Sequence, residues 1–513
     1  MVHAQLRWRH GWLLLAVAVL MATFVPAPDQ SSRAQVGDHQ SFYLPWVPHN
    51  DTANGQGPWF GKISIHNLSD DLCAVAIEVG RPGSWSRTAQ LSFPGGASRS
   101  ISSRSLALPS PGAPVRIDSV CPITATVKMV TPDVDRSPWS DGANVVTGYT
   151  GISYDDVQTS IHEGRSSWFL PIVQTNSGWN SFIRIANLQV SGAADVTIRL
   201  YSDDNPLGAD GELLEIERKI SVGSTDLVDV LGELHIQEWV GFAEIEADGA
   251  IGVFTTRSKP STDMAITNVA SAAGQPSEEG RYVLGAPLLF TAYNGWNTGI
   301  NLANISDQDA EVRIRYYESA GSMIREEQIE LRPHSMDYIY TPNDVEEEEF
   351  VGSASIESNV PIIAAVDEVK YRTGDGLSYV ASMLGQQRAA IPITFREDPD
   401  EGRHDNSGIN IHNLNPDAGQ TVQIRLLDSS GNSILEDPVT LTMPAGGNNF
   451  IYLPELDDIE PGTVATALIT SEEPAGFVAL SNNVNYSVPG DGAVTFSASG
   501  ENGYYRVLGS SGD

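Results

Sequence analysis

Apolar and polar residues alternate along much of this chain with a period of two. In the stretch ISIHNL (63–68), Ile63 and Ile65 fall on one face of an extended segment, and Ser64 and His66 fall on the other. Similar runs follow at short intervals, separated by clusters of Gly, Pro, Asn and Asp, and amphipathic helical patterns are scarce. The pattern predicts an all-β protein made of short antiparallel strands.

The same strand pattern returns four times in the chain. Its copies lie roughly 110 to 120 residues apart and read ISIHNL, IRIANL, INLANI and INIHNL, with asparagines at Asn67, Asn187, Asn304 and Asn413. An entry strand precedes each copy, and a second alternating strand and a broken pair of strands follow it in the same order. This period is longer than the 20–50 residues of solenoid repeats. We therefore expect four tandem antiparallel β-sandwich domains in series, each with its own core.

These landmarks also predict the domain boundaries. The predicted segments are a signal peptide (1–34), β-sandwich repeat 1 (35–155), a linker (156–166), repeat 2 (167–275), repeat 3 (281–387), repeat 4 (388–501) and a C-terminal tail (502–513).

The first segment has the features of an export signal. Arg7 and Arg9 precede an apolar run at 12–25 that is too short to span a bilayer, and cleavage is expected after Ala34. The mature chain would then carry no transmembrane anchor and would be secreted or held at the cell surface. An uncleaved membrane anchor is the alternative.

The order of motifs adds a resemblance. Residues 284–366 contain a Gly-Trp-Asn turn, an alternating strand ending in Asn, an Arg-Tyr-Tyr strand and a Gly-Ser-Ala-Ser-Ile strand. This order resembles the tandem immunoglobulin-like repeats of exported bacterial surface proteins. The resemblance implies immunoglobulin-like β-sandwich domains and an extracellular scaffold or adhesion role, and nothing about a ligand.

The charge balance limits the partners. The chain holds 30 Lys and Arg against 65 Asp and Glu, a net charge of −35. Such a chain repels phosphate backbones and anionic lipid headgroups, so we expect no nucleic-acid partner. Cell-surface polysaccharide or surface proteins are the partners that we expect instead.

The only two cysteines, Cys73 and Cys121, both fall in repeat 1. Two cysteines within one small exported domain favour a disulfide, which would contribute roughly 4 kcal/mol in the chain-entropy model. Two free buried thiols are the alternative.

The histidines and asparagines of the repeated strand invite a site hypothesis. His66 and His412 share one position, but Ala186 and Ala303 occupy it in the other copies, so we expect solvated histidines on an outward face rather than metal ligands. The asparagine persists in all four copies. We expect its side chain to bond nearby backbone at the end of the strand.

Three aligned tryptophans, Trp59, Trp179 and Trp296, are candidates for stacking on sugar rings. The alternative is that each one covers the end of its own sandwich core.

Acidic loops suggest a weak calcium hypothesis. Asp398, Asp400, Glu401 and Asp405 cluster in the entry loop of repeat 4, and carboxylates are the ligands that Ca²⁺ prefers. Their spacing does not match an EF-hand, and a solvated loop is the alternative. We otherwise expect no cofactor.

The sequence lacks several common catalytic and cofactor-binding motifs. It contains no Gly-x-Ser-x-Gly elbow, phosphate-binding loop or dinucleotide fingerprint. We therefore expect a non-enzymatic exported repeat protein that acts as a structural or adhesion scaffold. The alternatives are a carbohydrate-binding array that uses the three tryptophans and, third, an unrecognised secreted hydrolase.

Overall fold

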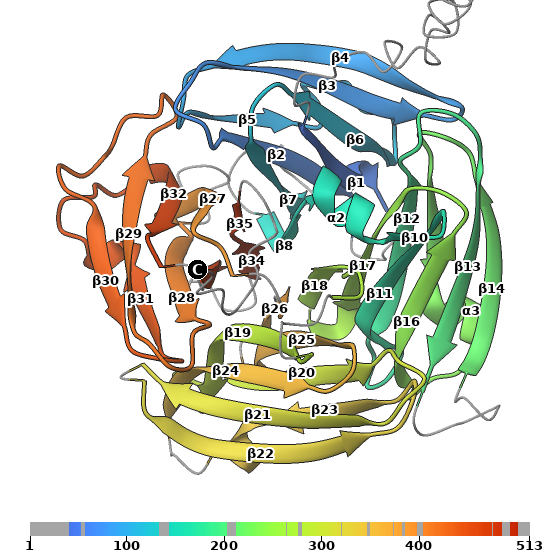
Figure 1. Ribbon diagram of the computed structural model, residues 1–513. Coiled ribbons are helices and arrows are strands. Elements are labelled where there is room, and N and C mark those ends of the chain that lie inside the picture. The colour runs from blue at the N-terminus through green and yellow to red at the C-terminus, as the bar shows by residue number, and fades with distance from the viewer. Residues whose placement is uncertain are drawn as a thin grey trace, which may run out of the picture. The chain divides into compact units, whose positions relative to one another are not determined.

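The computed structural model divides the chain between His39 and Gln40, and the second unit, Gln40–Asp513, is the compact body in Figure 1. The residues that it describes all belong to the second unit, and they are 40–52, 57–132, 143–202, 212–262, 264–274, 280–319, 321–345, 349–372, 374–381, 385–397, 404–473, 476–484 and 493–500. The predicted signal peptide and C-terminal tail lie outside these residues.

Most of the described residues form strands, which fall into four groups of eight. Group 1 contains β1 (Gln40–Asp51), β2 (Trp59–Asn67), β3 (Cys73–Arg81), β4 (Ser84–Phe93), β5 (Ser98–Ser102), β6 (Gly112–Ser119), β7 (Ile123–Pro132) and β8 (Ala143–Thr150). Group 2 contains β11 (Arg165–Gln174), β12 (Asn180–Asn187), β13 (Ala194–Tyr201), β14 (Glu212–Ile220), β15 (Thr225–Asp229), β16 (Val240–Ala247), β17 (Ile251–Lys259) and β18 (Met264–Val269).

The second half of the chain holds the other two groups. Group 3 contains β19 (Tyr282–Thr291), β20 (Asn297–Asn304), β21 (Ala310–Glu318), β22 (Met323–Leu331), β23 (Met336–Tyr340), β24 (Phe350–Ser358), β25 (Ile362–Lys370) and β26 (Asp375–Val380). Group 4 contains β27 (Arg388–Arg396), β28 (Asn406–Asn413), β29 (Gln420–Leu427), β30 (Val439–Met443), β31 (Asn448–Tyr452), β32 (Thr463–Ser471), β33 (Phe477–Val484) and β34 (Ala493–Ser497).

Short elements connect or end these groups. They are β9 (Ile152–Ser153), α2 (Tyr154–Thr159), β10 (Ile161–His162), α3 (Val230–Leu234), η2 (Pro260–Thr262), α4 (Thr341–Asp344), η4 (Leu453–Glu455) and β35 (Ser499–Gly500). The segment predicted as a linker, 156–166, contains most of α2 and all of β10. Within the described residues, no helix is long and apolar enough to cross a membrane.

All four groups use one antiparallel pairing order. The fourth, third, sixth and first strands pair side by side in one sheet, here called sheet I, and the fifth, second, seventh and eighth strands pair in a second sheet, sheet II. In group 1 the two sheets are joined because β1 also pairs with β2. The all-β prediction with several sandwich-like antiparallel domains is confirmed. The strand order differs from the ABED and CFG sheets of immunoglobulin constant domains.

The alternation seen in the sequence determines which side chains are buried. Along β21, Ala310, Val312 and Ile314 are buried, whereas Glu311 between them is exposed. Each group buries a hydrophobic core between its two sheets, as the period-two pattern requires. Each group therefore has its own core, as predicted.

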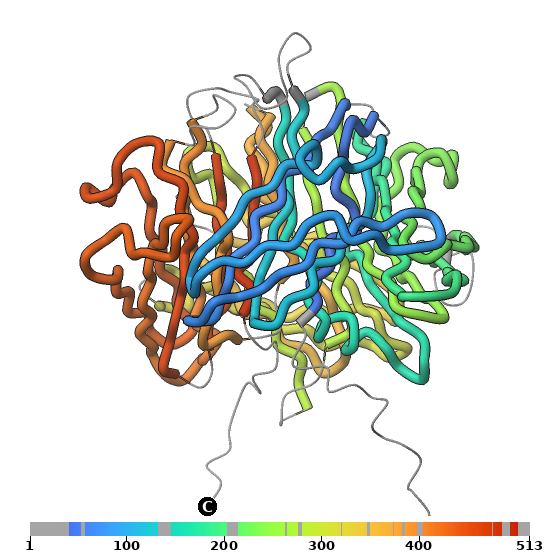
Figure 2. Tube along the Cα trace, turned by 90° about the horizontal axis from the view of Figure 1, so that it is seen from above, coloured from blue at the N-terminus to red at the C-terminus, as the bar shows by residue number. Residues whose placement is uncertain are grey.

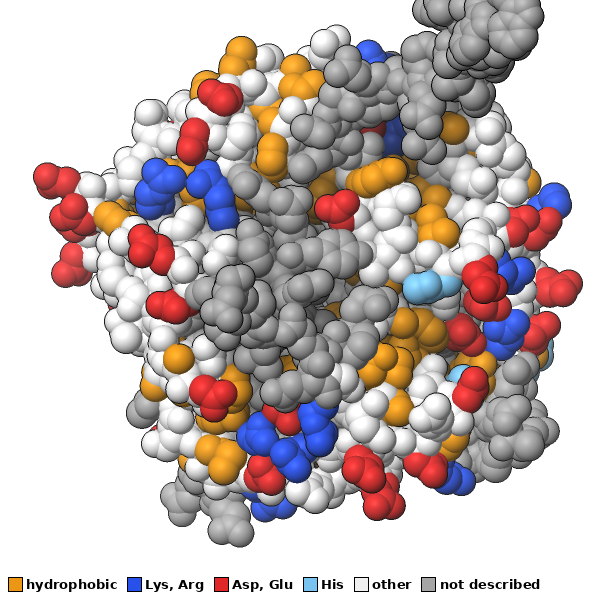
Figure 3. Space-filling view, in the orientation of Figure 1, with side chains coloured by type: hydrophobic (Ala, Val, Ile, Leu, Met, Phe, Trp, Pro, Cys, Tyr) orange, Lys and Arg blue, Asp and Glu red, His pale blue; other side chains and the backbone are white. Residues whose placement is uncertain are grey.

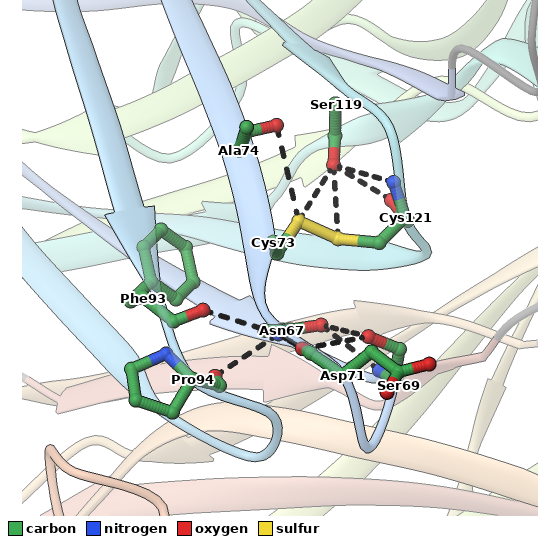
Figure 4. Close-up of a disulfide and its surroundings, with 9 residues drawn as sticks. All are labelled: Asn67, Ser69, Asp71, Cys73, Ala74, Phe93, Pro94, Ser119 and Cys121. Atoms are coloured by element: carbon green, nitrogen blue, oxygen red, sulfur yellow. Dashed lines mark hydrogen bonds between the residues drawn. A yellow bond between two sulfur atoms is a disulfide. The ribbon is translucent and has the colours of Figure 1, made fainter.

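The repeated asparagine ends the second strand of every group through the same hydrogen bonds. Its Oδ1 accepts the backbone N–H two residues further on at 3.0 Å in all four groups, and its Nδ2 donates to nearby backbone carbonyls. Figure 4 shows these bonds for Asn67 of group 1. All four side chains are fully buried. The expectation that this residue bonds nearby backbone at a strand end is confirmed.

The disulfide prediction is also confirmed. Cys73 at the start of β3 and Cys121 before β7 form a disulfide with 5.7 Å between their Cα atoms (Figure 4). The hydroxyl of Ser119 lies beside it and donates to the carbonyl of Cys121 at 2.7 Å. Within group 1, the bond therefore links β3 of sheet I to the segment that leads into β7 of sheet II.

The four groups pack against one another through a repeated contact. The first strand of each group, in sheet I, contacts the second and seventh strands of the next group, in sheet II, and β27 of group 4 makes this contact with β2 and β7 of group 1. The eighth strands also meet in a closed series, because β8 contacts both β18 and β34, and β26 contacts the same two strands. Within the unit Gln40–Asp513, the last group therefore closes onto the first (Figure 1).

The hairpin of β3 and β4 shows how one group touches two neighbours. In Figure 2 this blue hairpin extends between the green strands of group 2 and the red strands of group 4. Trp85 donates from Nε1 to the carbonyl of Gln189 in group 2 at 2.9 Å, and Ser98, after the hairpin, donates to the carbonyl of Ser429 in group 4 at 3.3 Å. Group 1 therefore contacts group 4 as well as group 2, the group that follows it in the chain. Their predicted boundaries stay predictions.

Candidate functional site

A cleft of about 560 Å³ lies at the junction between groups 2 and 3. One wall comes from sheet I of group 2, and the other comes from loops of group 3. The lining residues are Arg199, Tyr201, Glu244, Ile305, Ser306, Asp307, Gln308, His334, Val360 and Pro361.

The first wall follows from strand periodicity. Arg199 and Tyr201 are two residues apart on β13, so both point away from the core of group 2, and Arg199 lies directly opposite Glu244 on the neighbouring strand β16. Figure 3 shows acidic and basic side chains gathered on the right side of the molecule, over β13, β14 and β16. Because charged residues alternate with core residues along these strands, their side chains form a charged strip on the outer face of sheet I.

Arg199 connects the acidic side chains of that strip. Its guanidinium donates to Glu246 at 2.8 Å and Glu215 at 3.2 Å, and it reaches Glu244 at 3.4 Å. Burial alone would lower the pKa of the Arg199 guanidinium, but the hydrogen bond and charge of Glu246 and the charge of Glu244 raise that pKa overall. The guanidinium therefore remains a fixed cation in the wall.

A stack of three rings crosses the junction. The ring of Tyr201 lies between Phe242, at a centroid distance of 4.9 Å and an angle of 13°, and His334, at 5.0 Å and 16°. The hydroxyl of Tyr201 donates to Glu244 at 3.0 Å. The stack and this hydrogen bond hold the carboxylate of Glu244 in one orientation.

The second wall depends on the asparagine that ends β20. Asn304 accepts the N–H of Ser306 at 3.0 Å and donates to the carbonyl of Gln308 at 2.7 Å. Asp307, between them, has a side chain that is 96% exposed and accepts a hydrogen bond at 2.8 Å from Nε2 of His334 when that nitrogen is protonated. A structural feature of the repeated strand therefore also positions the loop 305–308 at the cleft.

His334 is unusual among its equivalents. It has a φ of +50°, and the matching turn residues of the other groups are glycines with φ of +64° to +68°, namely Gly96, Gly223 and Gly446. A non-glycine residue in this left-handed region costs on the order of 1–2 kcal/mol. At this one junction the chain carries an imidazole at a position where the backbone favours glycine.

The tryptophan candidates lie in the junctions between groups. Trp59, Trp179 and Trp296 are only 2%, 8% and 2% exposed. Trp179 packs with Val369 of group 3, and Trp296 packs with Val484 of group 4. Stacking on a sugar would require these rings to leave their packing, and the stacking role stays a prediction.

The expectation of solvated histidines is wrong. His66 and His412 are both fully buried, because the outward face of sheet II is covered by sheet I of the preceding group. Burial lowers the pKa of His66 to about 3 and that of His412 to about 4. Both rings are therefore neutral packing residues at physiological pH.

The calcium candidates remain largely untested. Asp398, Asp400 and Glu401 lie outside the described residues, and Asp405 is buried with its Oδ2 at 3.8 Å from Nζ of Lys128. Across the described part of the chain, no three His, Cys, Asp or Glu side chains gather in a way that would hold a metal ion. Calcium binding stays a prediction.

Sequence reasoning missed the residues of the cleft. Arg199 and Tyr201 lie more than 100 residues before Asp307 and His334, and only the packing of two groups brings them together. One signal was present, however. The turn RPHSM (332–336) has His334 where PGGAS, SVGST and PAGGN have glycine.

Comparisons with known proteins do not identify the chain. No protein-family model and no curated protein matches it. One similar chain belongs to a solved structure described as "Structure of infectious bursal disease virus Gx strain", with 10% sequence identity, 80% of this chain and 76% of that chain covered, and a TM-score of 0.10. A TM-score this low carries no argument about fold or function.

Proposed function

We propose that the chain is an exported, non-enzymatic scaffold whose four strand groups act as one rigid binding platform. We also infer that the four groups are tandem copies of one sandwich unit, since they share a pairing order and the same asparagine hydrogen bonds. A rigid body that holds a site between two of its parts is suited to binding, because little conformational freedom is lost when the ligand arrives.

The closing contact between groups 4 and 1 carries this proposal. Lys128 of group 1 lies 3.8 Å from Asp405 of group 4 and 4.8 Å from the centroid of the Phe395 ring. Arg388 of group 4 donates to the carbonyl of Leu68 in group 1 at 2.6 Å. Because the first and last groups hold each other, the other three junctions cannot open independently.

Four side chains of reactive types are in states that disfavour catalysis. The two cysteines of the chain are joined in a disulfide, so neither is a free thiol. His66 and His412 are buried, and burial disfavours the charged form that a general acid needs. These side chains serve packing rather than chemistry.

Small-angle X-ray scattering tests the platform. A compact body of this length is expected to have a radius of gyration of about 23 Å, and an open series of four domains would give a much larger value. A value near that of the compact body supports the proposal. A value that grows toward that of an extended array, in the intact purified chain, contradicts it.

Export needs a separate measurement. Fractionating the source cells and determining the N-terminus of the protein by mass spectrometry would show where the chain resides and whether residues 1–34 are removed. Recovery outside the cytoplasm with a new N-terminus after Ala34 is expected. Recovery of the full-length chain in the cytoplasm alone would contradict export and leave the platform intact.

A further inference from the structure

We propose that the cleft between groups 2 and 3 binds an uncharged oligosaccharide. This inference rests on the proposed function, because the cleft has both walls only while groups 2 and 3 stay packed. Its volume of about 560 Å³ falls within the range of about 300–1,000 Å³ that is typical of small-molecule sites. The space fits a few sugar units rather than a protein surface.

The cleft contains both hydrogen-bond donors and acceptors, and the carboxylates of Glu244 and Asp307 have partners that orient them. Glu244 accepts from the Tyr201 hydroxyl and from Arg199, and Asp307 is held by His334. Arg199 supplies N–H donors, and the exposed amide of Gln308 supplies both a donor and an acceptor. A sugar hydroxyl donates and accepts at once, so acceptors and donors that line the same cleft suit a polyhydroxylated ligand.

The same cleft has an apolar side. Ile305, Val360 and Pro361 line it next to the polar groups, and Ile305 and Val360 are largely buried. A pyranose ring presents C–H groups on its faces and hydroxyls at its rim. A wall with apolar and hydrogen-bonding parts matches that division.

Charge selects among polar ligands. Two carboxylates, Glu244 and Asp307, line the cleft against one guanidinium, Arg199, so phosphate, sulfate and uronate groups are disfavoured. A cationic ligand is not required either, because Glu244 already has Arg199 and Tyr201 as partners and Asp307 has His334. An uncharged ligand can use the second oxygens of these carboxylates without displacing a partner.

The other junctions fill the equivalent position with protein. A Cβ atom on Gly223 would lie 2.3 Å from the carbonyl oxygen of Ser84, and one on Gly446 would lie 2.6 Å from the ring of Tyr317. A Cβ atom on Gly96 would meet the side chain of Leu427 at 3.2 Å, a tight but looser contact. At the junction between groups 2 and 3 the side chain of His334 stands at this position and forms an edge of the cleft. Among the four equivalent turn positions, only the one at the junction of groups 2 and 3 carries a side chain beyond glycine that lines a cleft.

Isothermal titration of the intact chain tests the inference. The probes are cellohexaose, maltohexaose, xylohexaose and N-acetylchitohexaose, with tetralysine and oligogalacturonate as charged comparisons. We expect one neutral oligosaccharide to bind with a stoichiometry of one and with an affinity that changes less than about twofold between low and high salt. Glu244→Gln should weaken that binding by about tenfold or more.

Two further variants keep the test independent of folding. Asp307→Ala and Gln308→Ala change exposed side chains, so they should leave the fold intact and weaken binding by about threefold to tenfold each. Glu436→Gln, on an exposed side chain in group 4, is the matched control and should leave the affinity unchanged. No neutral probe bound, stronger salt-sensitive binding of either charged probe, or equal affinity in all variants would overturn the inference. If binding fails and the scattering result stays compact, the platform stands without this ligand.

Discussion

The imidazole ring of His334 lies nearly parallel to the phenol ring of Tyr201, with 5.0 Å between the ring centroids and 16° between the ring planes. The two residues belong to different strand groups, and the Tyr201 hydroxyl orients Glu244 in the cleft. The contact therefore joins the packing of groups 2 and 3 to the geometry of the candidate site. It also offsets part of the backbone cost of placing His334 at a positive φ.

Replacing His334 with glycine should separate stability from binding. His334→Gly relieves a left-handed residue but removes the Tyr201 stack and the Asp307 hydrogen bond, so the free energy of unfolding should change by less than about 1 kcal/mol. Oligosaccharide binding should weaken by about tenfold, since one edge of the cleft is lost. Urea unfolding and isothermal titration measure the two effects.

A matched control is available for this change. His235 also has a positive φ, +55°, at the exposed end of α3, away from the cleft. His235→Gly should stabilise the fold by about 0.5–1 kcal/mol and leave binding unchanged. If His334→Gly stabilises the chain as much as His235→Gly does, the stack with Tyr201 adds nothing to stability.

Glu368 should make the stability of the junction between groups 3 and 4 fall as the pH rises through the acidic and neutral range. The side chain is fully buried and accepts from Nδ2 of Asn482 at 2.6 Å. Burial raises the pKa of Glu368 to about 8, the Asn482 hydrogen bond opposes this rise, and the charge of Asp367 adds to it. The folded state therefore keeps its proton after the unfolded chain has lost it, so stability should fall as the pH rises from about 4.5 to about 8.

Glu368→Gln removes this loss while keeping an oxygen that accepts from Asn482. The variant and the original chain should have similar unfolding free energies near pH 5. As the pH rises toward about 8, the unfolding free energy of the variant should exceed that of the original chain by up to about 1.4 kcal/mol more for each pH unit. Urea unfolding across this pH range measures the difference, with exposed Glu436→Gln as the control. Parallel pH curves for Glu368→Gln and the original chain would show that Glu368 does not titrate in this range.

The buried pair at the closing junction should respond differently to single and double substitution. Lys128→Met leaves the Asp405 carboxylate buried without this cation and should cost about 3–5 kcal/mol. Lys128→Met combined with Asp405→Asn removes both charges and should recover much of that loss. Lys219→Met, at an exposed pair with Asp195, should have no measurable effect. Additive costs in the double variant would mean that the two charges do not interact.

The sequence predicts the strands of this fold better than it predicts which sheets pack against them. Alternation in ISIHNL correctly indicates that Ile63 and Ile65 face a core and that Asn67 ends the strand. It cannot indicate what covers the opposite face. Polar or small side chains such as Ser64 and His66 look solvent-exposed in a pattern, yet sheet I of group 4 buries them.

The cleft lay beyond prediction for a related reason. Its walls combine side chains from β13 and β16 with a loop and a turn of group 3, and nothing local in the sequence relates Tyr201 to His334. What the sequence did hold was a local conflict, an imidazole in a turn that uses glycine in its three equivalents. Such conflicts between a residue and its backbone are a guide to sites whose walls come from distant segments.

Because sheet I of one group covers sheet II of the next, the number of strand groups in this arrangement is constrained. Each group both covers a neighbour and is covered by another, so no group can serve as a terminal cap. Loss of any one group would leave one sheet I and one sheet II facing water, including side chains such as His66 or His412 that are neutral because they are buried. An array of solenoid type can gain or lose units at its ends. Within the described residues the four groups have no such ends, so removing any one group is expected to destabilise the other three.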